Sequence, residues 1–239
     1  MKKSKKRLFL ILATAVLIIF CSVSLFFVSK SRKFQFFGEL ITSIPNDDNK
    51  IALTFDDGPT ENTAAILGKL NELEIKATFF VCGAGIDARP EDAKAIVQAG
   101  HDLGSHSYSH QRMILKSYTF YKEEVDRTNE LVRASGYEGE IFFRPPYGKK
   151  LFVLPYYLNQ VDMTTVMWSI EPETILGNDA SPDEIAQYVI DNVESGSIIL
   201  LHPMYNAENV LAALDILIPK LQEQGYTFCT VSDLYDEYR

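Results

Sequence analysis

Residues 50–59, with the sequence KIALTFDDGP, combine a short apolar run with two adjacent carboxylates and a turn. Similar apolar runs recur along the chain, and segments with helical patterns alternate with them. The apolar runs predict strands at residues 50–55, 76–82, 102–105, 140–144, 163–169, 197–202 and 226–231. The helical patterns predict helices at residues 61–74, 89–99, 117–135, 182–194 and 206–224.

This alternation of strands and helices predicts an α/β domain with a parallel sheet. Closure of about seven parallel strands into a barrel is the simplest way to bury them, and such a barrel carries its site at the C-terminal ends of its strands. The side chains best suited to chemistry fall at or just beyond predicted strand ends: Asp56, Asp57, His106, Arg144 and His202. Topology and chemistry therefore indicate the same edge of the domain.

The positions of the histidines predict a metal site. Histidines four residues apart on a helical turn point to the same side, so His106 and His110 can reach one cation. Two imidazoles and one carboxylate suit a catalytic zinc-type site, which keeps its fourth position for water. Asp56 and Asp57 point to opposite sides of a strand, so one can bind metal while the other takes the proton of that water. Taken alone, an Asp-Gly-Pro turn and a pair of surface histidines each have an ordinary explanation.

The first fifty residues differ in kind from the rest. Basic residues in segment 1–7 precede an apolar run from Leu8 to Val28 that contains no charge. These 21 residues span about 30 Å as a helix, which matches a bilayer core. We expect a transmembrane anchor with a cytoplasmic N-terminus, a linker over residues 29–49 and an exported domain over residues 50–239. The alternative is a signal peptide cleaved after Ser22-Val23-Ser24, but the apolar run continues beyond that site.

Charge and cysteine content narrow the possible partners. The chain has 23 basic and 32 acidic residues, and residues 1–33 hold eight of the basic ones and no acid. Residues 34–239 therefore carry 15 basic and 32 acidic residues, a net charge of −17, which argues against a nucleic-acid partner. Cys82 and Cys229 lie in apolar segments, where two buried thiols are favoured over a disulfide. His101, at the entry of a predicted strand, is expected to be structural.

Four short motifs resemble those of the polysaccharide deacetylase family, carbohydrate esterase family four. They occur in the family's order, as residues 54–59 (TFDDGP), 106–110 (HSYSH), 144–148 (RPPYG) and 200–202 (LLH). The resemblance covers about residues 50–235 and implies a distorted (β/α) barrel with fewer than eight full units. It also implies a bound divalent metal, with zinc expected first and cobalt or nickel as alternatives that accept the same ligands.

The resemblance assigns roles to individual residues. It implies that Asp57, His106 and His110 bind the metal and that Asp56 is the general base. Arg144 would hold Asp56 ionised and oriented through its fixed planar charge. Three further roles are implied: an oxyanion held by the backbone N–H of Tyr147, a proton donated by His202, and substrate contacts from Tyr147, Trp168 and Leu200.

One family motif departs from its usual pattern. The family has Asp-x-x-Asp-Trp after a Trp-containing strand, whereas Trp168 is followed here by residues 171–175 with the sequence EPETI. Glu171 and Thr174 replace the two aspartates, and Ile175 replaces the tryptophan. Thr174 lacks the charge that the second aspartate is thought to place beside the acid histidine. Glu171 and Glu173 are therefore the two candidates to reach His202.

The resemblance implies metal-dependent removal of N-acetyl groups from amino sugars of an extracytoplasmic glycan. A membrane tether favours peptidoglycan as the substrate, and chitin-type oligosaccharides come next. Two alternatives stay open: removal of O-acetyl esters, as on xylan, and a glycan-binding domain that retains the metal without turnover. We expect a single-pass membrane protein that is monomeric, with secretion as the alternative.

Overall fold

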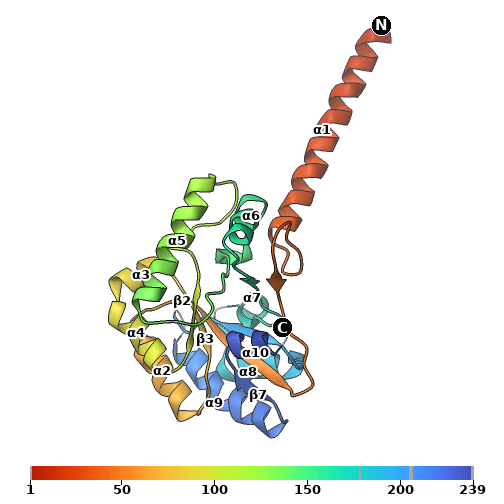
Figure 1. Cartoon of the computed structure of the whole chain (residues 1–239). Coiled ribbons are helices and arrows are strands. Elements are labelled where there is room, and N and C mark those ends of the chain that lie inside the picture. Colours follow the sequence, from red (N-terminus) through yellow and green to blue (C-terminus); the bar gives the residue numbers. More distant parts are fainter. Residues whose placement is uncertain (1, 178, 205–206, 238–239) are drawn as a thin grey trace.

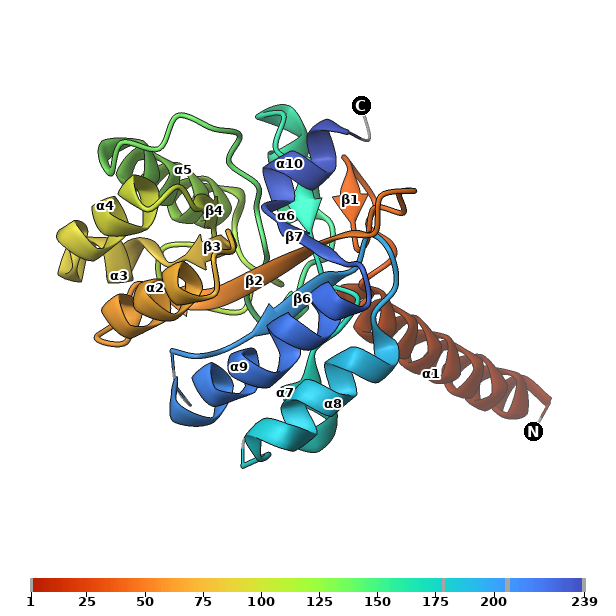
Figure 2. The ribbon, with the colours of Figure 1, turned by 90° about the horizontal axis from the view of Figure 1, so that it is seen from below.

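The central element of the computed structural model is strand β2 (Lys50–Gly58). The structure describes residues 2–177, 179–204 and 207–237. A five-stranded sheet has the order β4 (Asp102–Ser105), β3 (Thr78–Val81), β2 and β6 (Ile198–Leu201), with β7 (Thr227–Cys229) paired to the first part of β2. All of these pairings are parallel. Figures 1 and 2 show β2 crossing the middle of the domain, and the predicted parallel α/β class is confirmed.

A second parallel sheet pairs β1 (Leu40–Ile41) with β5 (Thr165–Val166). Single parallel bridges join the two sheets, from Ser105 to Phe143, from Phe143 to Thr165 and from Ile170 to Ile199. The prediction of a strand at 140–144 is wrong, because only Phe143 pairs there. Pro145 and Pro146 follow directly and have no N–H to extend a ladder.

Helices surround the strands (Figure 2). The five predicted helices are present, with ends that differ from the prediction by at most two residues: α2 (Thr63–Glu72), α4 (Pro90–Gln98), α5 (Tyr118–Ala134), α8 (Pro182–Asn192) and α9 (Ala207–Glu223). Residue 206, the first of the last predicted helix, lies outside the described residues. Ser181 and Glu184 form the reciprocal bonds of a capping box at the start of α8, which stabilises that end. Four short helices were not predicted: α3 (Gly83–Ala88), α6 (Val153–Gln160), α7 (Pro172–Leu176) and α10 (Val231–Asp236).

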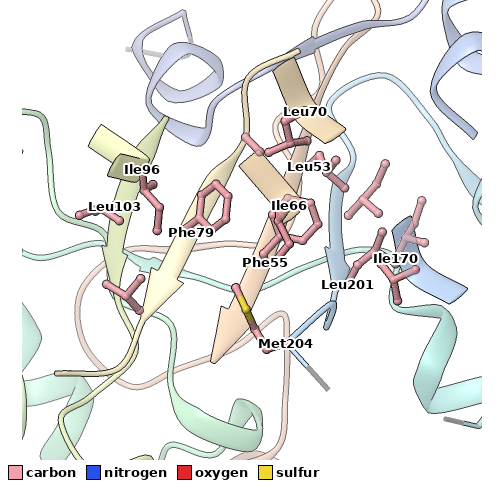
Figure 3. Packing of buried hydrophobic residues seen from close by; sticks show 14 of the residues in the cluster. Leu53, Phe55, Ile66, Leu70, Phe79, Ile96, Leu103, Ile170, Leu201 and Met204 are labelled. Carbon is pink, nitrogen blue, oxygen red and sulfur yellow. The ribbon is translucent and has the colours of Figure 1, made fainter. Parts of the chain in front are cut away.

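Both faces of β2 are buried, which explains its continuous apolar sequence. Leu53 and Phe55 pack with Phe79 of β3 and with Ile66 and Leu70 of α2 on the outer face (Figure 3). The intervening residues face a second apolar cluster, which gathers side chains from several strands: Ala52, Phe80, Val166, Ile198, Leu200 and Cys229. Asp56 continues the alternation of this inner face at the C-terminal end of β2.

Helix α1 (Lys2–Ser29) projects away from the domain (Figure 1). The segment Lys6–Ser29 is long and apolar enough to cross a membrane, and its most apolar 18-residue window is not buried against the domain. The chain does not become a free linker after α1, because the carbonyl of Ser29 accepts the backbone N–H of Lys150 at 2.9 Å. Farther along, Ile41 of β1 and Ile44 are buried.

Cys82 and Cys229 are both buried free thiols, as predicted.

Candidate active site

A cavity of about 640 Å³ opens beside the C-terminal ends of β2, β4 and β6. This size falls within the range of small-molecule sites. The lining contains eight of the residues proposed from the sequence: Asp56, Asp57, His106, His110, Tyr147, Trp168, Leu200 and His202. Gly148 and Met167 also line the cavity. Arg144 lies behind the lining and is completely buried.

A bulge at the end of β2 turns both carboxylates into the cavity. The register with β3 shifts between Asp56 and Gly58, and Asp57 has a φ of 68°. The expectation that Asp56 and Asp57 point to opposite sides is therefore wrong, because regular alternation ends at Asp56. Positive φ is uncommon for residues other than glycine, and it recurs at three more residues of this region: Ser107, His110 and Tyr147. Such backbone is concentrated at functional sites.

His106 and His110 converge on the carboxylate of Asp57. The Nε2 atoms lie 3.4 Å and 3.0 Å, respectively, from Asp57 Oδ1. The prediction of a helical turn for this pair is wrong, since the two histidines lie on a loop after β4. Ser107 and His110 have φ values of 63° and 55°, which an α-helix does not contain, and the Ser107 hydroxyl accepts the His110 N–H at 3.1 Å.

A buried glutamate, which sequence analysis missed, holds this loop. Glu124 of α5 accepts the backbone N–H groups of Tyr108 and Ser109 at 3.0 Å and 2.8 Å, and it also accepts the Ser109 hydroxyl. The available signal was a charged residue on the apolar face of α5, between Tyr121 and Thr128.

The donor set fits a divalent cation. His106 Nδ1 lies 2.7 Å from the carbonyl oxygen of Arg144, which can only accept, so Nδ1 carries a proton and Nε2 is the ring atom that can bind a cation. His106 Nε2 faces Asp57 Oδ1, which is buried and has no hydrogen-bond partner among the described residues. Burial raises the pKa of Asp57, but the imidazoles of His106 and His110 outweigh burial and hold the pKa well below its usual range. The three potential ligand atoms lie within 4.8 Å of one another, and this set of two imidazoles and one carboxylate suits zinc-type coordination.

Asp56 lies beside this group and is held by Arg144. The guanidinium donates to Asp56 Oδ1 at 2.7 Å and to the Thr54 hydroxyl at 2.8 Å. The carbonyls of Val166 and Met167 accept its other N–H groups at 3.2 Å and 3.0 Å. Because all of these bonds are buried, Arg144 fixes the orientation of the Asp56 carboxyl group.

Glu173, not Glu171, lies beside His202. Glu173 Oε1 is 3.5 Å from His202 Nδ1 and accepts the backbone N–H of His202 at 2.9 Å. Burial lowers the pKa of His202, but the contact with Glu173 and the charge of Asp56 outweigh it and raise the pKa to about 9. Glu171 instead accepts the indole N–H of Trp168 at 2.9 Å and pairs with Arg32 at 3.2 Å.

The remaining predicted residues divide between the cavity and the core. Tyr147 follows the two prolines, and a Cβ at the next residue, Gly148, would lie 3.2 Å from the ring of Trp168, which explains a glycine there with a φ of 62°. His101 is buried away from the cavity, where its Nδ1 accepts the N–H of Ala77 at 3.2 Å. Burial, and next the charge of Lys76, lower its pKa to about 4. Three basic residues of the lining were not predicted from the sequence: Lys30, Arg32 and Lys149.

Comparison with known proteins agrees with this arrangement. A sequence profile of the polysaccharide deacetylase family matches residues 43–166, which is more than half of the chain. The chain belongs to the polysaccharide deacetylase family. A peptidoglycan-N-acetylglucosamine deacetylase of Bacillus cereus is 35% identical over 195 residues, covering 80% of this chain and 70% of the relative. A Listeria monocytogenes deacetylase with the same substrate name is longer, and the chain spans 40% of its length at 31% identity.

Solved structures of this family include both enzymes and a pseudoenzyme. A peptidoglycan N-acetylglucosamine deacetylase bound to a substituted benzamide has a TM-score of 0.76 and 33% identity, covering 81% of this chain and 91% of that one. A family 4 pseudoenzyme of Bacillus anthracis has a TM-score of 0.74 and 30% identity, covering 84% of this chain and 69% of that one. A family 4 acetyl xylan esterase of Clostridium thermocellum, in complex with a cobalt ion, has a TM-score of 0.71 and 33% identity. The match covers 79% of this chain and 91% of that one.

Proposed function

We propose that the protein is a metal-dependent hydrolase that removes N-acetyl groups from amino sugars of an extracytoplasmic glycan. The observation that carries this proposal is the convergence of His106 and His110 on Asp57, beside an Asp56 carboxylate held by Arg144. Relatives named as peptidoglycan deacetylases make peptidoglycan the leading substrate, and chitin-type oligosaccharides come next.

Asp57, His106 and His110 would hold the metal. A bound divalent cation would lower the pKa of water and polarise the acetamide carbonyl. Zinc is proposed first, and cobalt or nickel would accept the same ligands. The cobalt ion in the related esterase supports a divalent metal without selecting one.

Asp56 is proposed to take the proton of the attacking water, because the hydrogen bond from Arg144 holds its carboxyl group in place at the cavity. The backbone N–H of Tyr147 would stabilise the oxyanion, and Leu200 would line the space for the acetyl methyl group. His202, with its pKa raised to about 9, would hold a proton at neutral pH and donate it to the departing amine. Trp168 would contact the sugar.

We also propose the organisation of the chain around this site. Residues 50–239 would form the catalytic domain as a distorted barrel of about seven parallel strands, and residues 29–49 would pack against it. Residues 8–28 would anchor a monomer in the cell membrane with the domain outside, because the segment is long and apolar. Cleavage of this segment, giving a secreted domain, is the alternative.

A second candidate activity is removal of O-acetyl groups from a polysaccharide, which the similar acetyl xylan esterase favours. The non-catalytic alternative is a glycan-binding protein that retains the metal, and the similar pseudoenzyme supports it. Glu173 beside His202 favours turnover, because it compensates for the charge that Thr174 lacks.

Acetate release separates these candidates. The full chain in non-ionic detergent, loaded with zinc, is incubated with peptidoglycan, N-acetylglucosamine oligomers and acetylated xylan, and Asp56→Asn is the matched inactive control. Acetate mainly from the two N-acetylated glycans supports the proposal. Acetate mainly from xylan supports the esterase, and glycan binding without acetate at full metal occupancy supports the pseudoenzyme.

A further inference from the structure

We propose that the active-site cavity carries an anion-binding rim, formed by Lys30, Arg112 and Lys149, that recognises a negatively charged group of the glycan. The bound group would be a carboxylate or a phosphate close to the reacting acetamido group. This inference rests on the proposed function and narrows its substrate class to acidic glycans.

The rim is assembled from three separate parts of the chain. Lys30 follows the apolar helix α1, Arg112 lies two residues after His110, and Lys149 follows Tyr147-Gly148. Lys30 and Lys149 both line the cavity, together with the ligand group and Tyr147. The guanidinium carbon of Arg112 lies 5.2 Å from the centre of the Tyr147 ring, which places its charge at the same side of the cavity.

Backbone and side-chain contacts hold Lys30 beside Lys149. Lys150 donates its backbone N–H to the carbonyl of Ser29 and its ammonium group to the carbonyl of Ser31. The Nζ atoms of Lys30 and Lys149 each lie 4.9 Å from the centre of the Phe26 ring. The segment that leaves the apolar helix therefore contributes directly to the wall of the cavity.

The structure gives these three cations no carboxylate partner in the part of the chain that it describes. Within residues 2–177, 179–204 and 207–237, no ion pair involves Lys30, Arg112 or Lys149, whereas Arg32 in the same cavity is paired with Glu171. Burial, followed by the charges of Lys30 and Arg112, lowers the pKa of Lys149, as expected for like charges held together. A bound anion would relieve this repulsion.

The charge of the whole domain makes such a rim useful for an acidic substrate. Residues 34–239 carry a net charge of −17, which repels an acidic glycan in general. Three carboxylates line the cavity, those of Asp56, Asp57 and Glu171, and Glu173 lies beside the lining residue His202. A local cluster of unpaired cations at the rim can overcome that repulsion and fix the position of one sugar.

The test compares substrates that differ only in charge. The full chain, metal-loaded in a non-ionic detergent, acts on a neutral N-acetylglucosamine oligomer, a carboxylate-bearing amino-sugar oligomer, the same oligomer with its carboxylates amidated, and a 6-phosphorylated N-acetylglucosamine oligomer. The variants are Lys30→Gln, Arg112→Gln and Lys149→Gln, with Lys149→Arg as the conservative variant. Lys33→Gln is the matched control, because this substitution removes the same charge close by, at a residue that does not line this cavity.

Each Gln variant should lower kcat/KM for the acidic oligomer by about 2- to 5-fold, through KM, and the loss for the neutral oligomer should be smaller. Lys149→Arg should restore the value, and added salt should reduce the difference. A larger loss with the carboxylated oligomer identifies a carboxylate subsite, and a larger loss with the phosphorylated oligomer identifies a phosphate subsite. Equal losses of kcat/KM for the acidic and neutral oligomers would overturn the proposal of an anion-binding rim. An equal loss of kcat/KM in Lys33→Gln would also overturn it.

Calorimetry keeps the inference separate from the proposed reaction. If the wild-type chain releases no acetate from any glycan, the proposed function fails, but binding of the carboxylated and amidated oligomers can still be compared. Tighter binding of the charged oligomer, lost in Lys149→Gln, supports the rim even then. Equal affinities of the two oligomers would reject it.

Discussion

Replacement of Glu173 by Gln should lower the upper pH limit of activity. The imidazolium form of His202 donates the proton in the proposed reaction, and this form is populated below the pKa, which is about 9. Activity should therefore fall as pH rises through that value. Glu173→Gln preserves the shape and an oxygen acceptor for the His202 N–H but removes the charge, so the imidazolium loses its proton at a lower pH.

The geometry gives the size of this shift. At the observed 3.5 Å between Glu173 Oε1 and His202 Nδ1, two unit charges interact by ~1 kcal/mol in water and by ~5 kcal/mol at an effective dielectric constant of about 20. Because the His202 side chain is one-quarter exposed to the open cavity, the lower end applies. We therefore expect the upper limb of the pH profile to move down by about 1 pH unit.

The assay is kcat/KM for acetate release between pH 6 and 11 at saturating metal. A bound cation lowers the pKa of His202 in both proteins, so the difference between them is the quantity compared. Glu171→Gln is the matched control, because Glu171 contacts Trp168 and Arg32 and should leave the upper limb in place. An unchanged limb in Glu173→Gln, or an equal shift in Glu171→Gln, would refute the reasoning.

The same contact has a consequence for stability. Because the pKa of folded His202 lies above the ordinary value of 6.5, the Glu173 contact stabilises the folded protein fully below about pH 6.5. That contribution disappears as pH rises through about 9. The free energy of unfolding of Glu173→Gln should therefore be lower than wild type at pH 6 and equal to it above pH 10.

Three further predictions concern the metal, the base and the anchor. Metal content, measured by mass spectrometry after dialysis, should fall strongly when Asp57, His106 or His110 is replaced singly by alanine. It should stay full in His101→Ala. An empty site in His101→Ala with a full site in His110→Ala would reverse this assignment. Asp56→Asn should keep its metal and lose about 10²- to 10⁴-fold in kcat, and near-normal acetate release would remove Asp56 from the mechanism. The protein should sediment with membranes through residues 8–28, and a soluble form that begins near Leu25 would identify a signal peptide instead.

The sequence predicted the parts of the fold that depend on local pattern. Strands buried on both faces have continuous apolar sequences, so β2, β3 and β6 could be located from the chain alone. The capping box at Ser181 explains why the start of α8 was placed correctly. The residues that the motifs indicated do gather around one cavity.

The parts that failed depend on backbone geometry and on contacts between distant segments. The loop that carries His106 and His110 uses positive φ values and an external carboxylate from Glu124, neither of which the spacing of two histidines reveals. The bulge that turns Asp57 into the cavity similarly breaks the alternation expected of a strand. Lys30 could not be placed at the site, because its position follows from backbone bonds between residues about 120 positions apart.

Metal removal and restoration test the central claim most directly. The full-length protein is stripped with a chelator, and acetate release from peptidoglycan is measured as zinc, cobalt or nickel is added back. We predict no acetate from the stripped protein and full recovery at about one equivalent of metal, with no recovery in His110→Ala at that concentration. Acetate release by the stripped protein at the original rate, or equal recovery in His110→Ala, would contradict the account.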